Sequence, residues 1–317
     1  MGSGHVHGSP DRTAPQVADL SKWAMLSLVV GIAVLLLKLA AWHVTGSVGL
    51  LSDALESLVN IAAALVAIFA LRTASRPPDV EHQFGHGKAE YFSALVEGSM
   101  IVVAATMIII TAVPRLFDPQ PLEEIGFGLA ISVVASLLNA VTAFVLFRIG
   151  RQHKSPALVA DAHHLVTDLW TTGGVVIGVL LVGLTGWNRL DPILALLVAA
   201  NIVYIGMGIL RSSASGLMDA ALPEADIDVI KTVLSNYRND DVVIHGLQTR
   251  AAGRQAFATM HVLVPGAQSV TQGHDICHAI ETDLISALPG LVVTTHLEPL
   301  EDPRAWNDTH EGQHDLD

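Results

Sequence analysis

Two apolar segments of the chain each carry three side chains of metal-ligating type at the same spacing. The two groups are Asp53, Glu56 and Asn60 in the first segment and Asp161, His164 and Asp168 in the second. Residues at positions i, i+3 and i+7 lie on one face of a helix. If the two faces turn toward each other, they offer four ligands, which are Glu56, Asn60, His164 and Asp168. Three oxygen donors and one imidazole suit a first-row divalent cation.

The placement of these groups inside apolar segments needs a reason, because ionisable side chains at the centre of a bilayer are costly. Polar side chains in such segments also hydrogen-bond neighbouring helices, and we favour that structural role for the lone Asn139 and Asn201. For two matching groups on separate segments we favour an ion site. Asp53 and Asp161 leave two interpretations open. Either they support the ligands and guide the ion, or they cap helix N-termini near the membrane edge.

The composition indicates a membrane protein with several spans. Hydrophobic residues make up 51% of the 317 residues, charged residues only 15%, and the mean hydropathy is +0.50. Runs of roughly 20 apolar residues match the hydrocarbon core of a bilayer. Six spans are predicted, at about 22–43, 48–72, 90–113, 125–148, 157–184 and 190–210. The net charge of −13 argues against a nucleic-acid partner, and the single cysteine, Cys277, excludes a disulfide framework within one chain.

Basic residues in the short flanks of the spans predict their orientation. One side holds Arg12, Lys22, Arg72, Arg76, Lys88, Arg148, Arg151, Lys154 and Arg211. The other side holds Arg115 and Arg189, with Lys38 near that end of the first span. Both termini are therefore expected in the cytoplasm. We predict a flexible segment over 1–20, a six-helix transmembrane domain over 21–212, a cytoplasmic domain over 213–303 and a disordered acidic tail over 304–317.

The pattern changes near residue 213. Helical spacing over 223–237 and 270–288, and strand-like segments over 242–250, 255–264 and 291–297, predict the order α-β-β-α-β. That order is typical of a small α+β domain with helices on one sheet. Its dispersed ligand-type residues are His245, His261, His274, His296 and Glu298. Neighbouring strands lie ~4.8 Å apart, so the strand histidines can converge, although spacing alone leaves this open.

A third group lies in the loop between the second and third spans. Asp79, His82 and His86 are spaced so that they can chelate one metal ion where the loop meets the next helix. Exposed loop histidines often bind nothing, so the residues alone favour neither interpretation.

Together these features resemble the cation diffusion facilitator family, and within it the bacterial zinc and iron efflux proteins of the YiiP (FieF) type. The resemblance covers about residues 20–303 and rests on the six spans, their paired motifs, the α+β domain and the loop stretch Phe84–Glu90. It implies a homodimeric, proton-coupled exporter of divalent metal in the bacterial inner membrane, which is not an enzyme. It also implies that the cytoplasmic domain has a metallochaperone-like fold.

The resemblance further implies a role for each group of ligands. The transport site falls on the four residues of the paired motifs, and a loop site falls on Asp79, His82 and His86. A binuclear site at the dimer interface falls on His245, His261, His274, His296 and Glu298. A charge interlock would join Lys88 to Asp219 and hold the membrane halves of two protomers together.

The second span departs from the pattern of the family's zinc members, which usually have Asp or His, then Asp, where this chain has Glu56 and Asn60. The resulting ligand set is harder and more flexible. Zinc is the first choice on the resemblance, with manganese, iron(II), cobalt or cadmium as alternatives. The alternative function is a membrane metal sensor without transport. A metallohydrolase would need a motif such as His-Glu-x-x-His, which the sequence does not contain.

Overall fold

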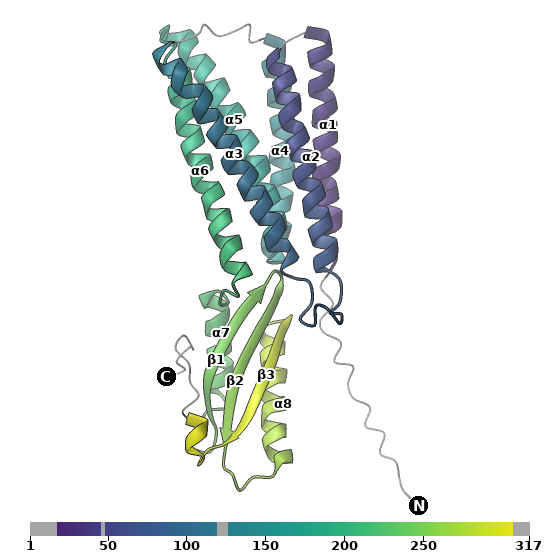
Figure 1. Ribbon diagram of the computed structural model, residues 1–317, viewed down its shortest axis with the longest axis vertical. Coiled ribbons are helices and arrows are strands. Elements are labelled where there is room, and N and C mark those ends of the chain that lie inside the picture. The colour runs from purple at the N-terminus through teal and green to yellow at the C-terminus, as the bar shows by residue number, and fades with distance from the viewer. Residues whose placement is uncertain (1–17, 46–47, 119–125, 307–317) are drawn as a thin grey trace, which may run out of the picture.

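The computed structural model describes residues 18–45, 48–118 and 126–306 (Figure 1). A long bundle of helices stands above a small domain of strands and helices in this view. Within the helices, a few side chains lie outside the described part of the structure, among them those of Asp53 and Glu56. For these two residues only the path of the helix is used below.

Six helices of the described chain are long and apolar enough to cross a membrane. They are α1 (Ser21–Thr45), α2 (Val48–Ala74), α3 (Ala89–Phe117), α4 (Gly126–Gln152), α5 (Pro156–Thr185) and α6 (Leu190–Leu217). The shortest, α1, has 25 residues and is therefore about 37 Å long. The predicted six spans are confirmed. In α1, α2, α4 and α5 the helix extends beyond the apolar span, whereas in α3 and α6 the two have the same bounds.

The bundle divides into two groups of helices that α5 joins. In Figure 1, α3 and α6 lie side by side, and α1, α2 and α4 lie on the other side. The second group and α5 share a buried core made of Leu20, Ala24, Ala67, Ile68, Leu71, Ala143, Leu146, Ala157, Leu158, Ala162 and Leu165. Ile101, Ala105 and Ile202 bury the contact between α3 and α6. The many alanines let the helix backbones approach closely.

Local signals fix both ends of α5, the helix that carries half of the predicted ligands. Ser155 is the N-cap residue, and its Oγ accepts a hydrogen bond from the N–H of Leu158 at 3.4 Å. Pro156 occupies the first helical position, where the missing N–H is not needed. Gly186 ends the helix in the left-handed conformation, with φ 71°. The defined start places His164 about 14 Å along the helix from Ser155.

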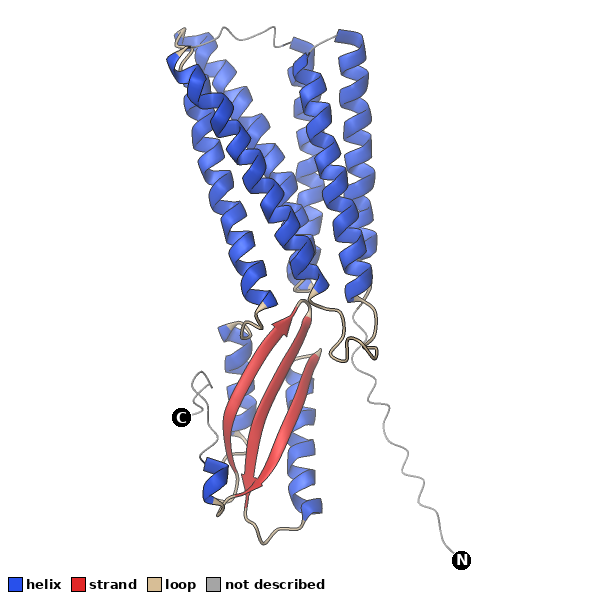
Figure 2. Cartoon of the chain, in the orientation of Figure 1, coloured by secondary structure: helices blue, strands red, loops and turns tan. Residues whose placement is uncertain are grey.

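The C-terminal domain confirms the predicted order α-β-β-α-β. It contains α7 (Glu224–Ser235), β1 (Val243–Ala252), β2 (Gln255–Val264), α8 (Val270–Ala287) and β3 (Leu291–Pro299). The strand β2 is central, antiparallel to β1 and parallel to β3. The two helices lie behind the sheet in Figure 2 and contact each other. The largest fully buried core side chains are Ile230, Leu234, Ile244, Leu247, Met260, Leu263, Ile280 and Leu284.

The beginning of the predicted disordered tail is ordered in the structure. A short 3-10 helix, η1, runs over Pro303–Trp306. The Trp306 indole N–H donates to the carbonyl of Leu300 at 3.0 Å, and Ala305 is buried. These contacts hold the segment against the domain, and hydropathy alone does not reveal them. Residues 307–317 lie outside the described part of the chain.

Replacing Ile280 with alanine tests the packing of α8 on the sheet. Ile280 is fully buried, so the change should lower the free energy of unfolding of the domain by ~2–5 kcal/mol. Amide hydrogen exchange of β2 in the full chain should accelerate at least about thirtyfold. Val270, 82% exposed on the same helix, provides the control Val270→Ala. Equal exchange rates in the two variants would place Ile280 outside the core.

Candidate metal sites

The polar groups predicted on the second and fifth spans meet between α2 and α5. Asn60 and His164 are buried, and His164 Nε2 lies 2.7 Å from Asn60 Oδ1. The amide Nδ2 of Asn60 donates a short hydrogen bond to Asp168 Oδ2. An ionised carboxylate only accepts, so the amide nitrogen faces Asp168 and the amide oxygen faces the imidazole. His164 Nε2 therefore carries a proton in this arrangement.

Three of the four predicted ligands are thus adjacent, and each has a defined place in the fold. Asn60 comes from α2, while His164 and Asp168 lie one turn apart on α5. Glu56 lies one turn before Asn60 on α2, and its side chain is outside the described part of the structure. Its role as a ligand stays a prediction.

The helix α4 adds a residue that we had assigned to helix packing alone. Asn139 is 3% exposed, and its Nδ2 donates to Asp168 Oδ2 at 3.2 Å. The same carboxylate oxygen therefore accepts hydrogen bonds from both asparagines, Asn60 and Asn139. Asn139 stands alone on its span, so no spacing in the sequence singles it out. Only the packing of α4 on α5 brings it to the site.

Asp53 and Asp161 do not cap their helices, so one of the two interpretations of these residues is wrong. The N-cap of α5 is Ser155, and Asp161 lies in the second turn. The helix α2 begins at Val48, so Asp53 lies well inside it. The remaining interpretation, support of the ligands or guidance of the ion, stays a prediction for both.

A second buried carboxylate lies near Asp161, and the sequence analysis missed it. Asp161 is 1% exposed, and its Oδ1 accepts from the Ser27 hydroxyl of α1 at 3.1 Å. Glu97 of α3 is fully buried, accepts from the Ser93 hydroxyl at 2.9 Å and interacts electrostatically with Asp161. Glu90, Ser93 and Glu97 have the same i, i+3 and i+7 spacing as the paired motifs, and this signal in the sequence could have indicated Glu97. Asp161 therefore shares its surroundings with a second acid.

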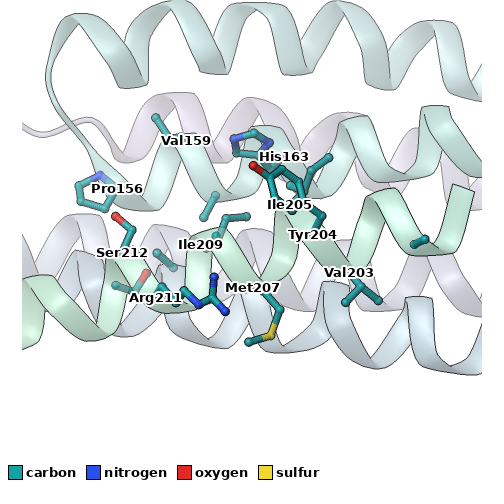
Figure 3. Close-up of a pocket in the computed structure, with 15 residues that line it drawn as sticks. Pro156, Val159, His163, Val203, Tyr204, Ile205, Met207, Ile209, Arg211 and Ser212 are labelled. Carbon is teal, nitrogen blue, oxygen red and sulfur yellow. The ribbon is translucent and has the colours of Figure 1, made fainter.

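The pocket drawn in Figure 3 lies on another face of α5. It has a volume of about 740 Å³ and is lined by α3, α5 and α6. Pro156, Val159 and His163 line it from α5, opposite Tyr204 and Arg211 of α6. None of the three described ligands of the paired motifs is among its lining residues. The ligands thus occupy the packed contact between helices, and this pocket is not part of their site.

The loop residues form a compact cluster at the lower end of the bundle. Asp79 Oδ1 lies 3.4 Å from His82 Nδ1, and Asp79 Oδ2 lies 3.3 Å from His86 Nε2. Potential ligand atoms of all three residues lie within 4.8 Å of one another, as one metal ion requires. The backbone N–H of His82, donating at 2.7 Å, holds the pKa of the exposed Asp79 carboxyl below its usual value. The carboxylate is therefore available as a ligand at neutral pH.

The predicted ion pair between Lys88 and Asp219 forms within one chain, with Lys88 Nζ 3.0 Å from Asp219 Oδ1. Arg250 of β1 binds the same oxygen at 3.0 Å. The hydrogen bond from Lys88, followed by that from Arg250, lowers the pKa of Asp219. The Arg250 guanidinium also lies over the rings of Phe84 and Phe257, at 4.9 and 4.2 Å. This contact joins the loop to the C-terminal domain, and a role between protomers stays a prediction.

Strand register brings three histidines of the C-terminal domain into one row. His245 pairs with His261, and His261 pairs with His296, so the row crosses all three strands. Adjacent ring centroids lie 5.1 and 5.0 Å apart. Glu298 Oε2 is 2.9 Å from His261 Nδ1 and 4.0 Å from His245 Nε2. Imidazole and carboxylate ligands of this kind fit zinc or a similar divalent ion.

His274, the remaining residue of this predicted group, lies on α8. Its ring stacks on that of His278 with centroids 6.3 Å apart. Both His274 and His296 are absent from the described cluster of His245, His261 and Glu298, although His296 Nδ1 lies 4.0 Å from Glu298 Oε1. The role of His274 as a ligand stays a prediction. Trp306 of η1 stacks instead on His245, with centroids 6.0 Å apart and planes 8° from parallel.

Comparison with known proteins shows the family to which the chain belongs. Residues 24–218 match the family described as the cation efflux transmembrane domain, and residues 222–300 match the cation efflux protein cytoplasmic domain. The chain belongs to the cation efflux family. The resemblance found in the sequence is confirmed, and this cation efflux protein is a multi-span transporter of metal ions.

Its similarity to curated relatives extends over nearly the whole chain. An uncharacterized transporter of Synechocystis sp. is 50% identical over 284 residues, which are 90% of this chain and 92% of the relative. The cation-efflux pump FieF of Serratia proteamaculans is 33% identical over 286 residues, 90% of this chain and 95% of the relative. The solved metal-bound C-terminal domain of the CzcD transporter from Thermotoga maritima is 25% identical. The match covers 26% of this chain and 99% of the solved domain, with a TM-score of 0.23.

The histidine row predicts a measurable loss of metal binding. His261 lies at the centre of the row, so His261→Ala should weaken zinc binding by the C-terminal domain about tenfold or more. Calorimetric titration of the full chain in detergent measures this affinity. His153→Ala, a change outside all three clusters, is the control. Unchanged zinc binding in His261→Ala would remove this cluster as a metal site.

Proposed function

We propose that this cation efflux protein exports a divalent transition-metal ion from the cytoplasm in exchange for protons, by alternating access. The observation that supports this most directly is the chain of hydrogen bonds from His164 through Asn60 to Asp168. It joins two membrane helices through side chains whose types can all ligate a metal ion. With Glu56 they would form the transport site, and Asp53 and Asp161 would guide the ion toward it.

In the proposed coupling, His164 carries the proton that is exchanged for the ion. Nε2 of His164 donates its proton to Asn60 Oδ1 in the structure. A ligating imidazole must be neutral and must offer a lone pair, so an imidazolium, protonated at both nitrogens, has to release one proton when an ion binds at Nε2. The same exchange in reverse, on the outer side, would release the ion. Protons would then move inward as metal moves out.

The resemblance and the donor set favour different metal ions. Zinc remains the first choice on the resemblance, while the harder oxygen donors favour manganese, iron(II) or cobalt more than a His/Asp quartet would. Cadmium remains a further candidate. Asn60 is the residue that we expect to set the choice of metal, because it places a neutral amide where the family's zinc members usually have a carboxylate.

The proposal also includes the location of the transporter, its dimerisation and its regulation by metal. The resemblance supports a bacterial inner-membrane location, and the distribution of Lys and Arg supports a cytoplasmic location of both termini. A homodimer is supported by the match to the family's cytoplasmic domain. Metal bound at the histidine row would draw two such domains together and increase transport, and the loop cluster would bind a further ion.

Removal of a ligand from α5 should abolish transport while the fold persists. We expect His164→Ala and Asp168→Ala to reduce zinc uptake into inside-out-oriented proteoliposomes to background. The lumenal pH change that accompanies uptake should disappear with it. His163→Ala, the neighbouring residue on another face of α5, is the matched control. Binding without flux in the unaltered protein would favour a metal sensor, and full flux in either ligand variant would refute the site.

Asn60→Asp should alter the choice of metal. A second carboxylate restores the charge usual in the family's zinc members, so zinc should gain relative to manganese and iron(II). A competition assay in proteoliposomes with zinc, manganese, iron(II), cobalt and cadmium measures the preference. An unchanged order of the five ions would show that Asn60 does not set selectivity.

Asn139→Ala should weaken transport without abolishing it. The change removes one of the two amide donors that hold Asp168 Oδ2. Loss of an outer partner of a metal ligand typically costs 10–100-fold in affinity or activity, so we expect a decrease of about tenfold or more in apparent metal affinity. Asn201→Ala on α6 is the control. If Asn139→Ala and Asn201→Ala change the apparent metal affinity equally, Asn139 has no specific role at the site.

A further inference from the structure

The turn between β1 and β2 inserts a buried arginine into the lower end of the helical bundle. The side chain of Arg254 is only 5% exposed, and its Nε lies 2.5 Å from Glu90 Oε1. Glu90, in the first turn of α3, is fully buried. Buried charges persist when they are paired and hydrogen-bonded. The two domains therefore meet at a desolvated ion pair, which lies outside the three candidate metal sites.

This ion pair gathers the ends of three membrane helices. The Ser155 hydroxyl, which caps α5, donates a short hydrogen bond to Glu90 Oε2. Arg254 Nη1 donates a short hydrogen bond to the carbonyl of Ala18, just before α1. In Figure 1 the tip of the β1–β2 hairpin lies directly below the bundle, as these contacts require. One guanidinium thus contacts the beginnings of α1 and α3, and through Glu90 that of α5.

Rigid elements lead from this contact in both directions. Arg254 lies seven residues before His261 of the histidine row, a distance of about 23 Å along β2. In the other direction, α5 runs about 14 Å from Ser155 to His164. A shift of the hairpin relative to the bundle therefore acts on the N-terminal cap of the helix that carries two of the transport ligands.

We infer that Arg254 is the positioning residue through which metal bound at the histidine row controls α5 and the transport site. The ion pair between Lys88 and Asp219 also joins the domains, but its side chains are 34% and 46% exposed. It connects the start of α3 to the segment after α6. The contact of Arg254 with Glu90 is dry and reaches the cap of α5, so it transmits a displacement of the hairpin to that helix.

The inference rests on the proposed transport function, and a double-mutant cycle tests the two separately. Zinc uptake into proteoliposomes is measured for the unaltered protein, His261→Ala, Arg254→Gln and the double variant. Arg304→Gln is the matched control, since Arg304 pairs with Asp302 on the surface of the same domain and is 91% exposed. Calorimetric zinc titration of each variant reports binding at the histidine row independently of transport.

We expect His261→Ala to slow uptake at least about fivefold in the unaltered background, the lower range of allosteric coupling. In the Arg254→Gln background it should have almost no further effect. Arg254→Gln should still bind zinc at the row and retain basal uptake, and Arg304→Gln should behave as the unaltered protein. The effects of His261→Ala and Arg254→Gln are then strongly non-additive.

Equal slowing by His261→Ala in both backgrounds would overturn the inference and leave the transport function intact. An absence of zinc uptake in the unaltered protein would overturn both. If Arg254→Gln does not fold, Arg254→Lys gives the same test. It keeps the charge, but a single ammonium lacks the planar fork that contacts Glu90 and Ala18 together. Additive effects with the lysine variant would equally overturn the inference.

Discussion

The hydrogen bond from the Asn60 amide to Asp168 is the contact on which the proposed transport site depends. Inside an apolar bundle each polar group needs a partner from the protein, because an unsatisfied one is costly. The amide of Asn60 satisfies two ligands at once, since its oxygen accepts from His164 and its nitrogen donates to Asp168. A carboxylate at position 60 would instead face Asp168 with a like charge. The neutral amide therefore lets the metal-free site close with fewer protons than two facing carboxylates would need.

The same requirement shapes the junction between the domains. Glu90 sits at the end of a membrane helix with no exposed surface, and it is satisfied by Arg254 and Ser155. Each partner comes from a different part of the chain. The junction is thus held by directional polar contacts more than by apolar area. Contacts of this kind favour one relative placement of the domains, because a small displacement leaves a buried charge without its partner.

The sequence predicts the spans and the ligands because both follow from local patterns. Apolar length reveals the six helices, and the repeated spacing of Asn60 with His164 and Asp168 reveals the facing polar groups. Strand alternation places His245, His261 and His296 on strands, but only the register shows that they form a row. Asn139 and Arg254 escape prediction for one reason. Each acts through a partner more than 25 residues away in the chain, and nothing in its immediate sequence indicates that partner.

The three candidate metal sites are linked through one small region of the structure. The loop cluster leads through Phe84 to Arg250, which lies on β1 with His245. The histidine row leads through β2 and its turn to Arg254, and from there to α5. Both routes cross the junction where α3 begins, at Lys88 and Glu90. The helix α3 packs on α6 in its own group, on α2 in the other group and on α5, which joins the two. Its first turn therefore lies where both groups of helices meet the C-terminal domain.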